Sequence, residues 1–301
     1  MSEPTDVDAL PVAWRELGSG PLVLLLGGLG TTRTGFDPQL AALASSYRCA
    51  AWDMPGYGAS PAPPGGLSFA GLADAAAGLI GALGETRAHV AGLSMGGQVA
   101  LHLTLRHPAR VRSLALLDSS PAFGLDGTDP EAWKRLRLDA LDAGETPASM
   151  AEAVLRPIMA PSVSESAVAA AVASMSRISP AGLRAAIECL PSHDVRSRLG
   201  EIAVPTLVLV GEHDEETPLS YAEALADGIP HARLQIIPGA GHILNLEAPE
   251  AVDLALRERA PPQVAREDLD PAPFGHRAAS TASRWARSAA FTASGASRFE
   301  T

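Results

Sequence analysis

The sequence predicts an α/β protein in which a mostly parallel central sheet is covered by helices on both faces. Six short apolar runs recur along the 301 residues, at 22–26, 48–52, 89–93, 111–117, 205–210 and 232–237. Strands that are apolar throughout are typical of a parallel sheet buried on both faces, since a face open to water would alternate polar and apolar residues. Alanine-rich amphipathic stretches such as residues 70–83 separate the runs and are expected to be the covering helices.

The alternation of strand-like and helical sequence breaks between residues 121 and 198. This segment has four helical patterns, around residues 132–141, 150–159, 165–176 and 181–190. We therefore expect residues 1–120 and 199–260 to form the core and residues 121–198 to form an inserted helical lid. Residues 261–301 are rich in Ala, Ser and Arg and are expected to be a poorly ordered tail, because they bury too little apolar surface to offset the entropy lost on ordering.

The overall composition indicates a soluble protein, but it names no substrate. The net charge of -11 is spread along the chain, which disfavours nucleic acid or an anionic membrane as a partner. Cys49 and Cys189 form no close pair and lie in apolar sequence, so buried free thiols in a reducing cytoplasm are expected. The first residues lack the basic start of a secretory signal, and no apolar run is long enough to span a bilayer. The composition leaves both a monomer and a homodimer open.

The stretch 92–97, Gly-Leu-Ser-Met-Gly-Gly, places Ser94 between two glycines where a strand is expected to give way to a helix. Such a turn is typical of a nucleophile elbow, in which a strained backbone holds the serine hydroxyl outward and the glycines let neighbouring elements pack close. A serine at this place can also simply cap the following helix. The nucleophile hypothesis therefore requires a base, an acid and an oxyanion site elsewhere in the chain.

A candidate acid and a candidate base follow in the chain. His242 lies in a loop of small residues after the last predicted strand, and ligands bind in loops at the carboxyl ends of parallel strands. Asp214 directly follows the strand at 205–210, so the order is nucleophile, acid, base, as expected for an elbow of this kind. A competing acid is Asp118, at the end of the run 111–117. Three neighbouring acids are interpreted as solvated loop charges: Glu212, Glu215 and Glu216.

The oxyanion site is expected to consist of two backbone N–H groups, those of Leu29 and Met95. Met95 follows the nucleophile, and Leu29 lies in the glycine-rich loop 27–30, where glycines let the amides turn inward. No group of histidines and cysteines has metal-ligand spacing. The loop also lacks the third glycine of a dinucleotide-binding pattern, because Arg33 occupies its place. We therefore expect neither a metal nor a cofactor.

These motifs together resemble those of the α/β-hydrolase superfamily. The resemblance covers residues 10–259 and rests on motifs at 27–30, 53–60, 92–97, 211–218 and 239–242. It implies the fold of that superfamily and a triad of Ser94, His242 and Asp214. Residues 92–100, 202–208 and 236–242 look most similar to the 3-oxoadipate enol-lactonase branch. One departure concerns the oxyanion loop, because members commonly have His-Gly where this chain has Gly27-Gly28.

The resemblance implies a cofactor-independent hydrolase of a small ester, lactone or related carbonyl compound that forms an acyl-enzyme. The same scaffold also serves carbon–carbon hydrolases, perhydrolases, and lyases or cyclases of secondary metabolism; a ligand-binding protein without catalysis is the alternative from another class. Candidate substrate contacts are Gly28 and, in the lid, Trp133, Met150, Met159 and Met175 for an acyl pocket, with Arg156 and Arg177 for a substrate carboxylate. For each lid residue, the alternative is helix packing or a solvated charge.

Overall fold

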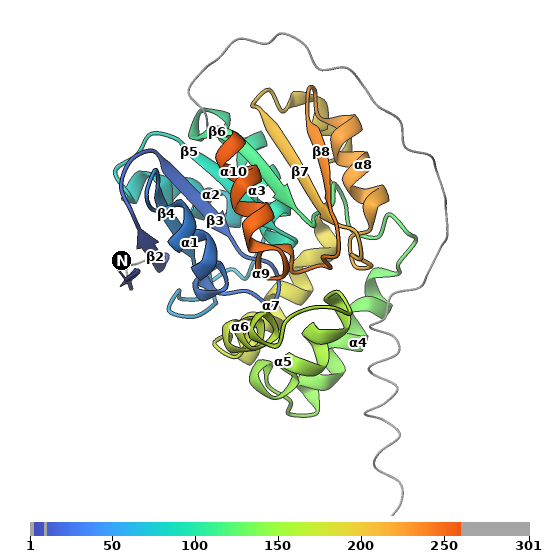
Figure 1. The fold of residues 1–301 in the computed structure, drawn as a ribbon. Helices are drawn as coiled ribbons and strands as arrows, with labels where there is room; N and C mark the ends of the chain where they lie inside the picture. Colours follow the sequence, from blue (N-terminus) through green and yellow to red (C-terminus); the bar gives the residue numbers. More distant parts are fainter. Residues whose placement is uncertain (1–2, 9–10, 260–301) are drawn as a thin grey trace, which may run out of the picture.

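The computed structural model describes residues 3–8 and 11–259, so the tail predicted for residues 261–301 lies outside the described residues. One eight-stranded sheet runs through the described part of the chain in the order β1-β2-β4-β3-β5-β6-β7-β8 (Figure 1). Neighbouring strands from β4 to β8 are parallel. At the other end of the sheet, β2 pairs antiparallel with β4 and β1 pairs antiparallel with β2. The strands are β1 Thr5–Val7, β2 Trp14–Leu17, β3 Leu22–Leu26, β4 Arg48–Trp52, β5 Ala88–Leu93, β6 Val111–Leu117, β7 Thr206–Gly211 and β8 Arg233–Ile237.

Six of these strands are the apolar runs predicted from the sequence, which confirms the α/β class. β3 and β7 are buried at every residue, as expected for strands with helices over both faces. The two antiparallel strands, β1 and β2, escaped prediction. They are short and mostly half-buried or exposed, so they carry no run of apolar residues that would mark them as strands.

The parallel register brings the carboxyl ends of the central strands to one edge of the sheet. Leu26 at the end of β3 lies opposite Gly92 of β5, and Leu93 lies opposite Leu117 of β6. The loops that follow β3, β5, β7 and β8 therefore meet at this edge, where ligands bind in open parallel sheets.

Helices cover both faces of the sheet (Figure 1). α1 packs against α10, and α2 packs against α3, which also contacts β5 and β6. No helix in residues 3–8 and 11–259 is both long enough and apolar enough to cross a membrane. The helices outside the insertion are α1 Asp37–Leu43, α2 Phe69–Ala82, α3 Met95–Arg106, α8 Leu219–Gly228, α9 Leu244–Glu247 and α10 Pro249–Arg259.

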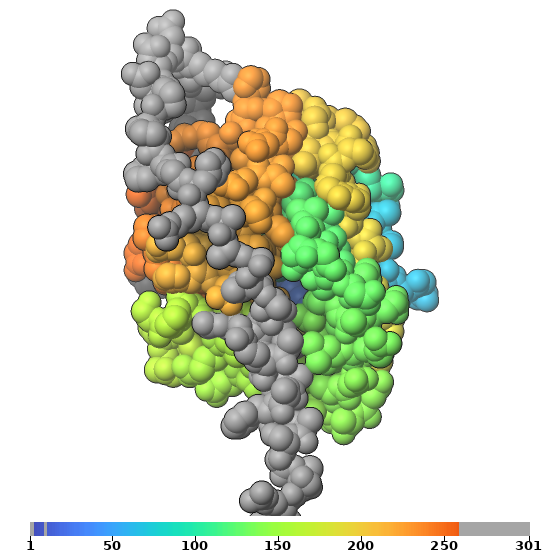
Figure 2. Space-filling view, turned by 90° about the vertical axis from the view of Figure 1, so that its right-hand side faces the viewer, coloured from blue at the N-terminus to red at the C-terminus, as the bar shows by residue number. Residues whose placement is uncertain are grey.

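The segment between β6 and β7 contains four α-helices, which lie together below the sheet in Figure 1. In the space-filling view of Figure 2, the green and yellow-green part of this segment again lies in the lower half of the molecule. They are α4 Pro130–Asp142, α5 Pro147–Leu155, α6 Glu165–Met175 and α7 Pro180–Cys189. The sequence marks their starts clearly, because in each case an Asp, Ser or Thr side chain accepts a backbone N–H of the first turn, and in α4, α5 and α7 a proline follows it. We refer to residues 121–198 as the helical insertion.

Candidate active site

Ser94 occupies the sharp turn between β5 and α3. Its backbone has φ 52° and ψ -121°, a conformation that L-residues adopt rarely and that costs on the order of 1–3 kcal/mol. The turn is possible because its neighbours lack side chains. A Cβ at Gly92 would lie 2.3 Å from the Gly96 oxygen, and a Cβ at Gly96 would lie 2.1 Å from the Leu26 oxygen. The Ser94 side chain caps no amide of α3, unlike an ordinary N-cap serine.

Ser94, His242 and Asp214 form one hydrogen-bonded chain. His242 Nε2 lies 3.0 Å from Ser94 Oγ, and His242 Nδ1 lies 3.0 Å from both carboxylate oxygens of Asp214. All three come from loops at the carboxyl edge of the sheet, after β5, β7 and β8. An imidazole in this position can accept the serine proton while the carboxylate fixes its tautomer and stabilises its cation.

Asp214 is held rigidly by its own loop. Its Oδ1 accepts the N–H groups of Glu216 and Thr217 at 2.8 and 3.0 Å, and its Oδ2 accepts the Thr217 hydroxyl at 2.7 Å. Burial alone would raise the pKa of Asp214, but the charge and hydrogen bond of His242 together with the Thr217 bonds hold it below its ordinary value. The acid is therefore ionised and unable to turn away from the imidazole.

His242 is buried among carboxylates, which favours its cation. Burial tends to lower the pKa of His242, but the adjoining Asp214 outweighs it and, with Asp118 and Glu216, raises the pKa to about 9. The loop that carries His242 is itself fastened to the helical insertion. The carboxylate of Glu247 accepts the N–H groups of Gly241, Ile243 and, from the insertion, Ala160.

Asp118, the competing acid of the sequence analysis, makes no hydrogen bond to His242 among the described residues. Its two oxygens accept the backbone N–H groups of Gly211 at 2.8 Å and Leu244 at 3.2 Å. Gly211 precedes Asp214 by three residues, and Leu244 follows His242 by two. Asp118 therefore links the loop that carries Asp214 to the loop that carries His242. Its side chain is fully buried, and its backbone has a positive φ of 43°.

The two expected oxyanion donors lie on either side of Ser94. Met95 opens α3, and Leu29 lies in the loop after β3, where a Cβ on Gly28 would stand 3.0 Å from the Ser94 Cβ. The Tyr57 hydroxyl donates to the Leu29 oxygen at 2.7 Å and so holds the loop in place. Within the described residues, neither the Leu29 nor the Met95 amide donates a hydrogen bond.

The absence of a histidine at Gly27 has a local explanation. A Cβ at Gly27 would lie 2.8 Å from the Thr31 oxygen and 3.0 Å from the Thr31 side chain, so this loop is too tightly folded for any larger residue. The Thr31 N–H donates to the Gly28 oxygen at 3.1 Å and closes the turn. Together with the Tyr57 hydrogen bond, this turn orders the loop without a histidine.

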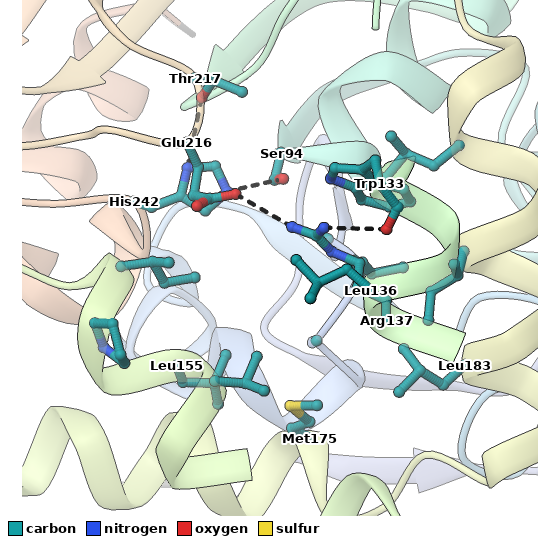
Figure 3. Close-up of a pocket in the computed structure, with 18 of the residues that line it drawn as sticks. Ser94, Trp133, Leu136, Arg137, Leu155, Met175, Leu183, Glu216, Thr217 and His242 are labelled. Carbon is teal, nitrogen blue, oxygen red and sulfur yellow. Dashed lines mark hydrogen bonds and ion pairs between the residues drawn. The ribbon is translucent and has the colours of Figure 1, made fainter. Parts of the chain in front are cut away.

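A cavity of about 580 Å³ opens between Ser94 and the helical insertion. It is lined mainly by apolar side chains from α4, α5, α6 and α7 (Figure 3). Among the predicted contacts, the lining includes Gly28, Leu29, Trp133, Met150 and Met175, along with Ser94 and His242.

Three predicted substrate contacts lie outside the cavity lining, and for these the structure corrects the sequence analysis. Met159 is 3% exposed and packs in the core, because the chain bends away in a short 3₁₀ turn after α5. Arg156 is on the surface, where it pairs with Glu152 and Glu165. Arg177 is exposed in the turn between α6 and α7. Helical periodicity did not reveal which side of each helix faces the sheet.

Several charged residues of the cavity wall were missed by the sequence analysis, and two of them, Arg137 and Glu216, face each other. Arg137 of α4 lies over the Trp133 ring at 3.9 Å, and its Nη2 lies 3.9 Å from the Glu216 carboxylate (Figure 3). Glu216 had been interpreted as a solvated loop charge, yet its side chain is only 18% exposed and lines the cavity. No group of three or more His, Cys, Asp or Glu side chains suited to a metal ion occurs in the described part of the chain.

Comparison with known proteins matches this architecture to a family. The model of the alpha/beta hydrolase family matches residues 23–253. The pimeloyl-[acyl-carrier protein] methyl ester esterase of Chromobacterium violaceum is 36% identical over 230 residues, which cover 75% of this chain and 89% of that protein.

Solved structures with the same fold include enzymes of both ester and lactone hydrolysis. The thermophilic esterase from Thermogutta terrifontis is 29% identical with a TM-score of 0.75, covering 85% of this chain and 97% of that one. The enol-lactonase from Burkholderia xenovorans LB400 is 27% identical with a TM-score of 0.76, covering 84% and 98%. The resemblance indicated by the sequence motifs is confirmed: the chain belongs to the alpha/beta hydrolase family.

Proposed function

We propose that the chain is a cofactor-independent serine hydrolase of small carboxylic esters or lactones, with Ser94 as nucleophile, His242 as base and Asp214 as the acid that orients it. The observation that carries this proposal is the continuous chain of 3.0 Å contacts from Ser94 Oγ through the imidazole to Asp214, starting at a strained elbow. Strain at a functional position persists only where the surrounding structure imposes it.

The proposed reaction begins when Ser94 Oγ attacks the carbonyl carbon and His242 Nε2 takes its proton. The carbonyl oxygen becomes an oxyanion, and the N–H groups of Leu29 and Met95 are the donors for it. When the intermediate collapses, the bond to the alcohol oxygen breaks and His242 returns the proton to that oxygen. A water molecule, deprotonated by His242, then attacks the acyl carbon; when this second intermediate collapses, the bond to Ser94 Oγ breaks, His242 returns the proton to Oγ, and the carboxylic acid is released.

The substrate class is supported by the cavity and by the relatives. A volume of about 580 Å³ suits a small molecule, and the mainly apolar lining suits an acyl chain. The relatives reported above are named as esterases and an enol-lactonase. Both reactions need the same serine attack on an acyl carbon, so one site serves an open ester or a lactone.

The test is replacement of Ser94 by Ala, with turnover of a panel of p-nitrophenyl esters and labelling by a fluorophosphonate probe as readouts. Loss of the nucleophile should lower kcat by about 10⁶-fold, as when an intact triad loses its serine, and should abolish labelling. Ser166→Ala is the matched control, because Ser166 is an exposed serine of α6.

Three outcomes would contradict the proposal. Ester hydrolysis that survives in Ser94→Ala would remove Ser94 from the mechanism. A native chain that resists the fluorophosphonate probe would instead favour a ligand-binding protein. Turnover of vinylogous diketones without turnover of esters would favour a carbon–carbon hydrolase.

A further inference from the structure

The ionisable side chains that line the cavity are predominantly acidic. Asp126, Glu145, Glu215 and Glu216 contribute carboxylates, and Arg137 is the one arginine or lysine in the described lining. The rest of the lining is mostly apolar, which weakens dielectric screening inside the cavity. An anionic substrate would therefore meet a repulsive field, and a cationic one an attractive field.

The charge of Arg137 is already matched by protein groups. Its guanidinium stacks on the Trp133 ring, and its Nη1 donates to the Trp133 oxygen at 3.3 Å. Its Nη2 faces Glu216 at 3.9 Å, and only 5% of the side chain is exposed. Arg137 is thus part of the cavity wall, and a substrate carboxylate would have to compete with Glu216 for it.

The Glu216 carboxylate, by contrast, has unused acceptor capacity. It accepts no hydrogen bond from any described residue, and its ion-pair partner Arg137 stands 3.9 Å away, beyond hydrogen-bonding distance. Burial raises the pKa of this carboxyl, as expected where a buried charge is incompletely compensated. A half-buried carboxylate that lines a cavity and lacks hydrogen bonds is well placed to accept one from a ligand.

Glu216 also lies on the side of the cavity where a leaving group would be released. Figure 3 shows its carboxylate beside His242 and near Ser94, while Leu155, Met175 and Leu183 are spread along the side of the cavity away from Ser94. His242 must protonate the leaving oxygen, so the alcohol part of an ester would pass on the His242 side. The acyl chain would then extend toward the apolar wall.

We propose that Glu216 makes the site selective for esters of amino alcohols, whose protonated amine would lie against the Glu216 carboxylate while the acyl chain occupies the apolar wall. This inference rests on the proposed serine hydrolase function. It adds that the site disfavours a carboxylate in the leaving group, in contrast to the arginine-bound carboxylate that the sequence offered as one alternative.

The experiment compares three butanoate esters that differ mainly in charge. Their alcohols are 2-(dimethylamino)ethanol, which is cationic near neutral pH, the neutral isostere 3-methylbutanol, and 3-hydroxypropanoate, which is anionic. Acid release gives kcat/KM for each. On the native chain, we expect the cationic ester to exceed the neutral one by about tenfold and the neutral one to exceed the anionic one by about tenfold, as one well-placed charge interaction provides.

The variant Glu216→Gln keeps the shape of the side chain and removes its charge. The ratio of kcat/KM for the cationic over the neutral ester should fall most of the way to one, because both esters share the same chemical step and the nearest charge interaction is lost. Glu223→Gln removes a carboxylate from the exposed surface of α8 and should keep the native ratio.

The order of the three esters is measured on the native chain and so does not depend on how a variant folds. Equal turnover of the three esters, or preference for the anionic ester, would overturn the proposal. The proposal would also be overturned if Glu216→Gln kept the native ratio of kcat/KM for the cationic over the neutral ester. Turnover of the neutral ester and fluorophosphonate labelling report the hydrolase function separately, so a failure of selectivity is distinguishable from a failure of the proposed function.

Discussion

Replacing Asp214 by Asn should lower kcat by about 10⁴-fold, whereas the same change at Asp118 should lower it by less than about tenfold. The structure explains the difference. The Asp214 Oδ1 accepts two backbone N–H groups, so the amide oxygen of Asn would stay there and its NH₂ would replace Oδ2. That NH₂ would donate to His242 Nδ1 and force the proton onto Nε2, where the imidazole can no longer accept the Ser94 proton.

A 10⁴-fold loss corresponds to about 5.4 kcal/mol of transition-state stabilisation. At Asp118, the amide oxygen of Asn could keep the bond from Gly211, but its NH₂ would face the Leu244 N–H. One buried donor would lose its acceptor, which costs about 1–3 kcal/mol in the free energy of unfolding. The Asp118 variant should therefore lose stability and keep most of its turnover.

The assay pairs steady-state hydrolysis of a p-nitrophenyl ester with urea unfolding of each variant. Stability must be measured because a drop in kcat from partial unfolding would imitate a catalytic effect. If Asp118→Asn lowers kcat more than Asp214→Asn while both variants remain folded, then Asp118 is the catalytic acid and the assignment made from the His242 contacts is wrong.

Three further predictions concern the loop, the base and the surface. Gly28→Ala should reduce kcat by about 100-fold and slow fluorophosphonate labelling, because the new methyl group would crowd Ser94 from 3.0 Å; native rates in this variant would exclude the loop from catalysis. The pKa of His242 is raised to about 9, and only the neutral imidazole can act as base, so kcat/KM should rise with pH through an ionisation above 6.5. A pH–rate profile whose rise is centred at or below pH 6.5 would contradict this. Arg156→Gln should change KM by less than about twofold for neutral and anionic esters alike, since this exposed residue lies outside the cavity lining; a large rise in KM for the anionic ester alone would restore the carboxylate-binding hypothesis.

Local sequence was sufficient for the features that depend on local physics. Apolar runs such as 22–26 predict buried strands because any residue facing water would interrupt them. The glycines at 92 and 96 predict the turn at Ser94 because no side chain fits at those positions. Ser94, Asp214 and His242 each follow a predicted strand in the sequence, which places all three at the carboxyl edge of the sheet. The structure brings them into contact there.

The tertiary structure was needed to show which strands pair with each other and which face of a helix or loop is buried by its neighbours. β2 is defined by its pairing with β4, and β1 by its pairing with β2, and neither strand carries an apolar run in the sequence. Glu216 looks like any loop acid in the sequence, but the packing of α4 encloses it in the cavity with Arg137.

The sequence by itself determined the fold class and the candidate nucleophile, because strand burial and elbow geometry are set by residues adjacent in the chain. Only the tertiary structure shows that Asp214, and not Asp118, hydrogen-bonds His242, and that Arg137, and not Arg156, lies in the cavity wall. The physical reason is the same in both cases: hydrogen-bond partners and cavity walls come from segments far apart in sequence, and their distances exist only once the chain has folded.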